Sequence, residues 1–336
     1  MHFTKFLTLI IYLIIQRKRV SFKYFFFLIL KLTQMISFFF LVFLCLPIHY
    51  SQIYVSPNSN HTTSDGSLAL PFPDLNSALN ATTSQIILLD GIYYVQNLTI
   101  SQRSLTITSL NGATKTIIDG GSNSGCLNLV SGTFTFDGLT IQNCVKFNDS
   151  TTNVSSVNSG AGIWIESSHV NLSNLIISGN NADFVGGGIA LYSGSLSLYN
   201  CTIQNNTAVF GGGIYLKSAY ILLSNNSLVQ SNCGKSLGGG IHIENGTTEA
   251  ENSSRVQNNI LGTNGVKNQG YCSFGNIVFS SSASTDLGYE CHSCTIQDQN
   301  PGGQNNLCGP APNNNHNPKL RFFGMSVLVL VVGMFL

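Results

Sequence analysis

Charged side chains are scarce in this sequence, where Lys, Arg, Asp and Glu together make up 9% of 336 residues. Between Gln52 and Asn313, seven cations stand against fourteen acids, which gives this span a net charge near −7. Nucleic-acid binding needs clustered cations, and scattered cations in an acidic span do not supply them. The sequence also lacks a nucleotide-binding glycine motif, a zinc-protease helix motif and a nucleophile elbow. These absences exclude nucleic acid as a partner, and no cofactor or metal site is predicted.

What the sequence has instead is a glycine-rich motif that recurs at a nearly constant interval. Its four copies are Gly160–Ile165, Gly186–Leu191, Gly211–Leu216 and Gly238–Ile243. A second motif, Ile/Val-x-x-Asn, runs in phase with the first and ends at Asn180, Asn206 and Asn232. Between the motifs lie apolar runs of period two that are too short for helices. Each repeat therefore predicts three short strands separated by turns.

The repeats are expected to stack, because a single copy cannot bury its own apolar side chains. Each strand then pairs in parallel with its equivalent about 4.8 Å away. The result is a parallel β-helix with a period of about 26 residues. Glycine permits a positive φ at a turn that recurs in every coil. Asn180, Asn206 and Asn232 are expected to form a structural ladder of side-chain amides.

Several stretches resemble known β-helix families. Asn206–Tyr215 is similar to the repeat of polymorphic outer-membrane proteins, in which Phe-x-x-Asn precedes Gly-Gly-Ala-Ile. Ile53–Pro57, Pro71–Leu79 and Ile86–Tyr93 resemble the opening segment of pectin-lyase-like β-helix proteins. The resemblance implies an all-β, right-handed parallel β-helix in which Asp74–Leu79 forms a short capping helix. A Cys-rich cap is expected at the other end.

The two ends of the chain carry apolar segments that are typical of targeting signals. The stretch from Met35, the candidate true start, has the length of a signal-peptide core, and a longer signal anchor is the alternative. Small polar residues, a short spacer and an apolar tail at the C-terminus follow the order of a GPI-attachment signal, with a membrane-inserted tail as the alternative. The expected parts are thus a signal peptide or signal anchor (1–51), an N-terminal cap (52–85), the β-helix (86–245), a degenerate coil with the Cys-rich cap (246–312) and the C-terminal signal (313–336).

Modification signals indicate a secretory route. Eight cysteines remain beyond Cys45, an even number that is consistent with disulfides in an oxidising compartment. Cys291-x-x-Cys294 has zinc-site spacing, but no second such pair occurs, so disulfides are expected. We expect a glycoprotein on the extracellular face of the plasma membrane, held by a lipid anchor or hydrophobic tail, or a secreted one. Eleven Asn-x-Ser/Thr sequons support this address, at Asn60, Asn80, Asn97, Asn148, Asn153, Asn171, Asn200, Asn205, Asn225, Asn245 and Asn252.

Alternation along the glycine-rich strands defines a candidate binding face. The Ile and Leu positions are expected to point inward, which leaves Trp164, Tyr192, Tyr215 and His242 among the outward positions. Aromatic rings bind sugars by stacking against their apolar faces. We expect these rings to lie exposed on one flat face, where an extracellular polysaccharide or glycoprotein would be the partner.

Catalysis on this face is not expected. Glu166 and Glu244 lie three coils apart, about 14 Å at the strand spacing, whereas glycosidase carboxylates lie roughly 5–9.5 Å apart. No Asp-Asp doublet like that of polygalacturonases occurs, and Arg103 and Arg255 are the only arginines between the signals. The sequence therefore favours a structural, adhesive or carbohydrate-binding role, without catalytic residues. A polysaccharide-degrading enzyme is the alternative, because the pectin-lyase-like group includes lyases and hydrolases.

Overall fold

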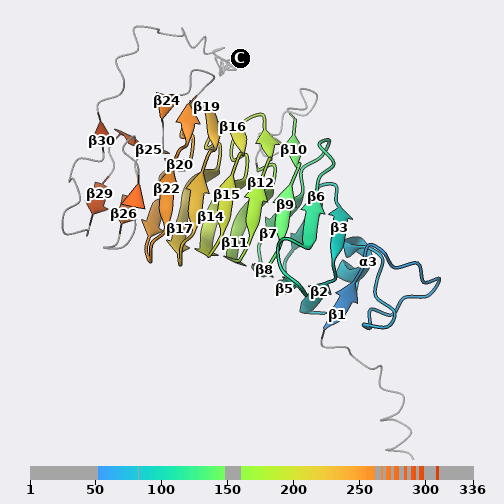
Figure 1. Cartoon of the computed structure of the whole chain (residues 1–336). Helices are drawn as coiled ribbons and strands as arrows, with labels where there is room; N and C mark the ends of the chain where they lie inside the picture. The colour runs from blue at the N-terminus through green and yellow to red at the C-terminus, as the bar shows by residue number, and fades with distance from the viewer. Residues whose placement is uncertain are drawn as a thin grey trace, which may run out of the picture. The chain divides into compact units, whose positions relative to one another are not determined.

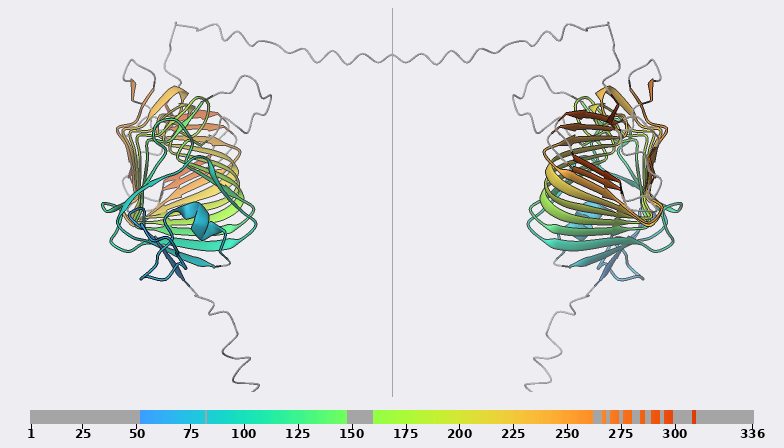
Figure 2. Two further views of the ribbon diagram at one scale, coloured as in Figure 1. Left: turned by 90° about the vertical axis from the view of Figure 1, so that its right-hand side faces the viewer. Right: turned by 90° about the vertical axis from the view of Figure 1, so that its left-hand side faces the viewer.

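The structure is a computed structural model that divides into two units, Met1–Tyr50 and Ser51–Leu336. It describes residues 52–81, 83–147 and 160–260 with their side chains, and the backbone of the strands between 261 and 309. The first unit and the predicted C-terminal signal lie outside the described residues. In the second unit the chain passes through three sheets in turn and forms the predicted right-handed parallel β-helix (Figure 1). Its stacked coils are seen from both ends in Figure 2.

The first sheet is the largest, with sixteen strands among the described residues. Its strands are β1 (Ile53–Val55), β2 (Gln85–Leu88), β4 (Leu98–Ser101), β5 (Ser104–Ser109), β7 (Leu127–Val130), β8 (Thr133–Asp137), β11 (Ile163–Ser173), β14 (Ile189–Tyr199), β17 (Ile214–Ser224), β20 (Ile241–Glu244), β21 (Thr247–Ala250), β25 (Gly270–Ser273), β26 (Asn276–Phe279), β28 (Tyr289–His292), β29 (Thr295–Asp298) and β30 (Cys308–Gly309).

The other two sheets are built from shorter strands. The second sheet contains β3 (Gly91–Tyr94), β6 (Thr116–Asp119), β9 (Thr140–Gln142), β12 (Ile176–Ser178), β15 (Thr202–Gln204), β18 (Leu228–Gln230), β22 (Arg255–Gln257) and β27 (Ser284–Thr285). The third contains β10 (Val145–Lys146), β13 (Asn181–Ala182), β16 (Thr207–Phe210), β19 (Cys233–Leu237), β23 (Ile260–Leu261) and β24 (Val266–Lys267). Three sheets account for the three strands expected in each repeat.

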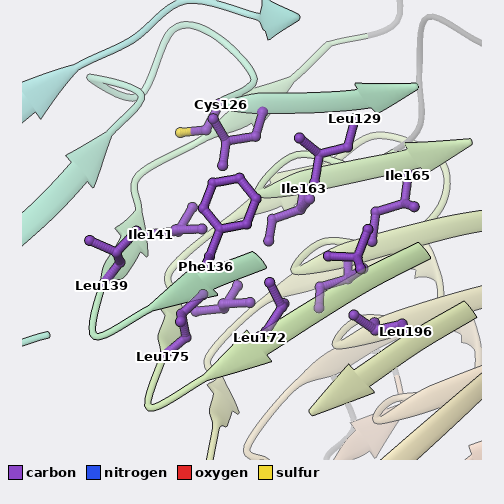
Figure 3. Packing of buried hydrophobic residues seen from close by; sticks show 14 of the residues in the cluster. Cys126, Leu129, Phe136, Leu139, Ile141, Ile163, Ile165, Leu172, Leu175 and Leu196 are labelled. Atoms are coloured by element: carbon purple, nitrogen blue, oxygen red, sulfur yellow. The ribbon is translucent and has the colours of Figure 1, made fainter. Parts of the chain in front are cut away.

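Equivalent strands pair in parallel and in register, so like residues stack from coil to coil. Ile163 is the Cα partner of Ile189, Ile189 of Ile214, and Ile214 of Ile241. All four side chains are fully buried in the core between the sheets, and Figure 3 shows neighbouring core residues such as Phe136, Ile165 and Leu172. Burial of each such side chain contributes about 1.5–3 kcal/mol to folding. The alternation of the glycine-rich strands therefore places its apolar residues inward, as predicted.

The long strands of the first sheet bend once, at a serine. Ser167, Ser193 and Ser218 have φ values of 49°, 63° and 51° in β11, β14 and β17. A positive φ interrupts the pleat and turns the chain. Residues before the bend of β11 pair with β7, and residues after it pair with β8. The first sheet thus presents two separate outer faces.

A column of asparagines joins successive coils inside the fold. The Asn180 side-chain amide donates to Asn206 Oδ1 at 3.0 Å, and the Asn206 amide donates to Asn232 Oδ1 at 3.0 Å. Each of these acceptor oxygens also accepts the backbone N–H of the preceding asparagine at 3.0 Å. The Asn232 amide continues the ladder to Asn259 at 3.0 Å. The repeat therefore keeps its phase beyond Asn245, with β21 and β22 pairing in parallel with β17 and β18.

The N-terminal end of the stack carries α3 (Leu75–Leu79), visible in Figure 2. Asp74 is its N-cap and accepts the backbone N–H of Ser77 at 2.8 Å, while Leu75 and Ala78 are buried. Arg103 donates to the carbonyl oxygen of Leu79 at 3.0 Å. One of the two arginines between the signals therefore holds the capping helix.

The cysteines divide between a disulfide and a buried thiol. Cys126 and Cys144 form a disulfide with a Cα–Cα distance of 5.5 Å. Cys201 is not part of a disulfide, and its buried thiol donates a hydrogen bond to the carbonyl oxygen of Leu172. Burial raises the pKa of this thiol to about 11. The side chains of the four C-terminal cysteines lie outside the described residues.

No helix in the described part of the chain is long and apolar enough to cross a membrane.

Candidate functional site

Two rows of outward side chains cross the strands β11, β14, β17 and β20 before the serine bend. One row consists of Trp164, Ala190, Tyr215 and His242, and the other of Glu166, Tyr192, Lys217 and Glu244. Both rows follow from alternation with the buried Ile and Leu positions. With Phe184, Val185 and Phe210, they line a hollow of about 510 Å³, except for the buried Ala190. We call this hollow the aromatic groove.

One wall of the aromatic groove comes from residues that precede the glycine triplets. Phe184 and Phe210 pack edge to face with their ring centroids 5.4 Å apart, and Phe210 packs against His242 at 5.5 Å. The glycines allow the chain to turn tightly from the third sheet into the first. A Cβ at Gly187 would lie 2.4 Å from the carbonyl oxygen of Thr207, so a larger residue at this position would force the backbone to shift. The glycine triplets therefore determine the positions of Phe184 and Phe210 beside the first sheet.

The floor of the aromatic groove is a stack of rings. Tyr215 and His242 are stacked with centroids 5.2 Å apart, and Tyr192 packs on Tyr215 at 5.6 Å. Tyr215 and His242 are only 5% and 6% exposed, whereas Trp164 and Tyr192 are half-buried. The prediction of a flat, exposed aromatic face is therefore wrong, because Phe210 covers part of it. Trp164 and Tyr192 keep ring surface that a ligand can reach.

A hydrogen-bonded charge cluster lies at one end of the groove. Glu244 Oε2 accepts the hydroxyl of Tyr215 at 2.5 Å, and its Oε1 pairs with Lys217 Nζ at 2.7 Å. Both charged side chains are well exposed, at 45% for Lys217 and 40% for Glu244. Partial burial opposes ionisation of Glu244, but the bonds from Lys217 and Tyr215 outweigh it and hold its pKa below the usual value. Glu244 is therefore a carboxylate with both oxygens engaged.

The two aromatic titratable groups of the floor stay neutral at physiological pH. Burial lowers the pKa of His242 to about 4, against an opposing effect of the nearby Glu244 charge. Burial, followed by the hydrogen bond to Glu244, raises the pKa of Tyr215 far above its usual value. These two buried groups therefore add no charge to the floor of the groove.

The carboxylates of the groove are not placed for paired acid–base chemistry. Glu166 and Glu244 occupy the same row three strand steps apart, which is about 14 Å. Glycosidase pairs require roughly 5–9.5 Å. In the part of the chain that the structure describes, no group of three or more His, Cys, Asp or Glu side chains could hold a metal ion.

One buried polar atom belongs to a residue that lines the groove. The indole Nε1 of Trp164 is buried and has no hydrogen-bond partner in the described parts of the chain. A buried indole N–H normally finds an acceptor. This donor is thus available to an acceptor from outside the described residues.

The sequence missed the wall of the groove, because Phe184 and Phe210 lie outside both repeat motifs. Their positions just before the glycine triplets were the available signal. The sequence did find all four aromatic positions Trp164, Tyr192, Tyr215 and His242, and the structure brings them together in one hollow.

Comparison with known proteins agrees with this architecture. Residues 114–296, more than half of the chain, match the family described as the right handed beta helix region. The chain belongs to this family of right-handed β-helix proteins. No curated protein matches the sequence.

Solved structures of pectin methylesterases are similar in fold. PemA from Erwinia chrysanthemi has 12% identity and a TM-score of 0.38, over 73% of this chain and 89% of that chain. A pectin methylesterase in complex with a hexasaccharide has 12% identity and a TM-score of 0.38, over 77% and 97%. The enzyme from Aspergillus niger has 14% identity and a TM-score of 0.32, over 79% and 89%. Likeness at this level concerns the fold and not the chemistry.

Proposed function

We propose that this protein binds carbohydrate in the aromatic groove and does not degrade it. The observation that carries the proposal is the half-buried pair Trp164 and Tyr192, which lie in a hollow of about 510 Å³ against the apolar wall of Phe184 and Phe210. Sugar sites combine such ring surface with a few polar groups that orient hydroxyls. The Trp164 indole N–H and Glu166 are groups of this kind.

A polysaccharide-degrading enzyme is the less favoured reading of the same groove. Glu244 holds its proton weakly and has both oxygens engaged by Tyr215 and Lys217, whereas a general acid needs a raised pKa. His242 is buried and neutral. Neither group is suited to protonate a leaving sugar.

The first test is binding of the purified glycoprotein to a panel of soluble and insoluble polysaccharides, with reducing ends and released methanol measured in the same samples. We expect retention of the protein on at least one polysaccharide without release of either product. Tyr192→Ala should weaken retention at least tenfold. Tyr199→Ala is the matched control, because Tyr199 is 50% exposed and lies beyond the serine bend, outside the groove. Release of reducing ends or methanol would support the enzyme. Equal losses of retention in the two variants would show that the groove is not the binding site.

We also propose that the protein reaches the cell surface through the secretory pathway. Eight of the eleven sequon asparagines are exposed in the described residues, a placement that glycosylation requires. Treatment of intact expressing cells with a phosphatidylinositol-specific phospholipase tests the proposed GPI anchor. Release of the glycoprotein into the medium is the expected result, and retention on the cells would favour a membrane-inserted tail or a signal anchor.

A further inference from the structure

The ionised groups of the aromatic groove leave no cation for an acidic ligand. Three charged side chains line it, namely Glu166, Lys217 and Glu244. Lys217 is already neutralised by Glu244 at 2.7 Å. Glu166 then leaves the groove with a net negative charge, on a body that is itself acidic. A polyuronate entering this groove would meet repulsion without a compensating ion pair.

The polar groups that remain suit hydroxyls. The Trp164 indole Nε1 is a donor with no partner in the described residues, and Glu166 is an acceptor at the groove lining. A sugar hydroxyl both accepts and donates, so it matches this mixed pair, whereas a carboxylate only accepts. The half-buried rings of Trp164 and Tyr192 favour the apolar face of an uncharged pyranose.

The groove also has a direction. Its two accessible rings come from successive coils, Trp164 from β11 and Tyr192 from β14, and the residues that line it extend over β17 and β20. Successive coils are about 4.8 Å apart, which is close to the advance of an extended polysaccharide per pyranose unit. A linear chain lying across the strands would therefore place one sugar at each coil.

We propose that the ligand of the aromatic groove is a neutral, linear hexopyranose polysaccharide that lies along the stack of coils, with one sugar unit per coil. The proposal rests on the carbohydrate-binding function above and gives that function its ligand class. It also separates this protein's ligand from acidic pectin.

The test compares hexasaccharides of equal length by calorimetry. The probes are the neutral β-linked hexamers of glucose, mannose and N-acetylglucosamine, and the acidic hexamer of galacturonate. At least one neutral hexamer should bind tenfold or more tightly than hexagalacturonate, and its affinity should not change between about 50 and 500 mM salt. Tighter binding of hexagalacturonate would overturn the neutral ligand but leave the carbohydrate-binding function standing. Binding of no polysaccharide or hexamer in the two experiments would overturn the function itself.

Charge reversal in the groove gives an independent check. Glu166→Lys should raise the affinity ratio of hexagalacturonate to the neutral hexamer at least tenfold, because it supplies the missing cation. Glu251→Lys makes the same charge change outside the groove lining and should leave the ratio within twofold. Equal ratios in the two variants would show that the local charge does not select the ligand.

A series of oligosaccharide lengths tests the direction of binding. Affinity for the neutral ligand should rise with each added unit to about four units, because four coils line the groove. A plateau already at one or two units would overturn binding along the coils.

Discussion

Two columns of side chains cross the same coils of this β-helix, and they follow opposite rules. The ladder repeats one residue type, in Asn180, Asn206, Asn232 and Asn259, and each amide bonds to the next. The outer row changes at every coil, from Trp164 to Ala190, Tyr215 and His242. Identity along the ladder is a condition of folding, because each residue completes its neighbour's hydrogen bonds. Variation along the outer row shows that the fold accepts different residue types there, and Trp164, which keeps exposed ring surface, is open to binding.

The largest expected effect comes from breaking the ladder with Asn206→Ala. The substitution leaves the Asn180 amide and its backbone N–H without their acceptor, and removes donors to Ile177 and Asn232. Each buried unsatisfied group costs about 1–3 kcal/mol. We expect a loss of about 3–5 kcal/mol in the free energy of unfolding, measured by urea titration. Gln204→Ala in the same coil is the control, since its side chain accepts one hydrogen bond from Gln230 among the described residues and should lose less than about 1 kcal/mol. Equal losses would refute the special role of the ladder.

Gly187→Ala should disrupt the tight turn between the third sheet and the first. We expect the free energy of unfolding to fall by about 2–3 kcal/mol. The added Cβ would meet the carbonyl oxygens of Thr207 at 2.4 Å and Gly212 at 2.5 Å. Thermal unfolding measures the loss. Gly112→Ala is the control for backbone strain alone, because its φ is 88° but nothing lies within 4 Å of the added Cβ. A smaller loss at Gly187 than at Gly112 would contradict the contact argument.

His242 in the outer row should make the free energy of unfolding depend on pH. The amides of the ladder do not titrate and cannot have this effect. His242 is buried, and its pKa falls from 6.5 to about 4 on folding. Between these values the unfolded chain binds the proton and the folded chain does not, so stability falls as pH decreases from about 6.5 to 4. We expect a decrease on the order of 3 kcal/mol, and His242→Gln should flatten this part of the profile. Glu244, whose pKa is also lowered, adds its own loss as pH falls through its folded value. An unchanged profile in His242→Gln would rule out the buried imidazole as the cause.

The smallest expected change in free energy is in polysaccharide binding, and it comes from substitution of Trp164. Trp164→Ala removes ring surface and the indole donor, and should weaken polysaccharide binding about tenfold, or about 1.4 kcal/mol. Trp164→Phe restores a ring without the donor and should recover part of the affinity. Calorimetric titration measures both. If the phenylalanine variant bound no better than the alanine variant, ring stacking would not contribute.

The repeat predicted most of the fold because its requirements recur in every coil. Glycine recurs at the tight corner and asparagine recurs in the ladder, so Gly187 and Asn206 stand out in the sequence itself, although Ala161 takes the place of Gly187 in the first copy. Val256-x-x-Asn259 carries the same signal, although its spacing from Asn232 is slightly longer than that between the earlier asparagines. Pairing between coils tolerates this difference, because an extra residue in a turn leaves the strands on either side in register.

The groove was predictable only in part, because its shape depends on residues that no repeat specifies. Alternation placed Trp164 and Tyr192 outward correctly. It could not show that Phe210 would cover Tyr215 and His242, since that contact joins the third sheet to the first across a corner. Alternation along a strand predicts which side of the sheet a residue faces. It does not predict whether another part of the chain covers that side.

The in-register coil has a consequence for how such a protein changes over generations. Duplication of one coil, from one glycine triplet to the next, would add a rung to every column without disturbing its neighbours. The same event would lengthen the groove by one strand spacing and place a new, freely mutable residue in each outer row. Gene-level gain or loss of a repeat would then lengthen or shorten the site in whole units, so that the length of polymer recognised becomes a heritable, countable trait.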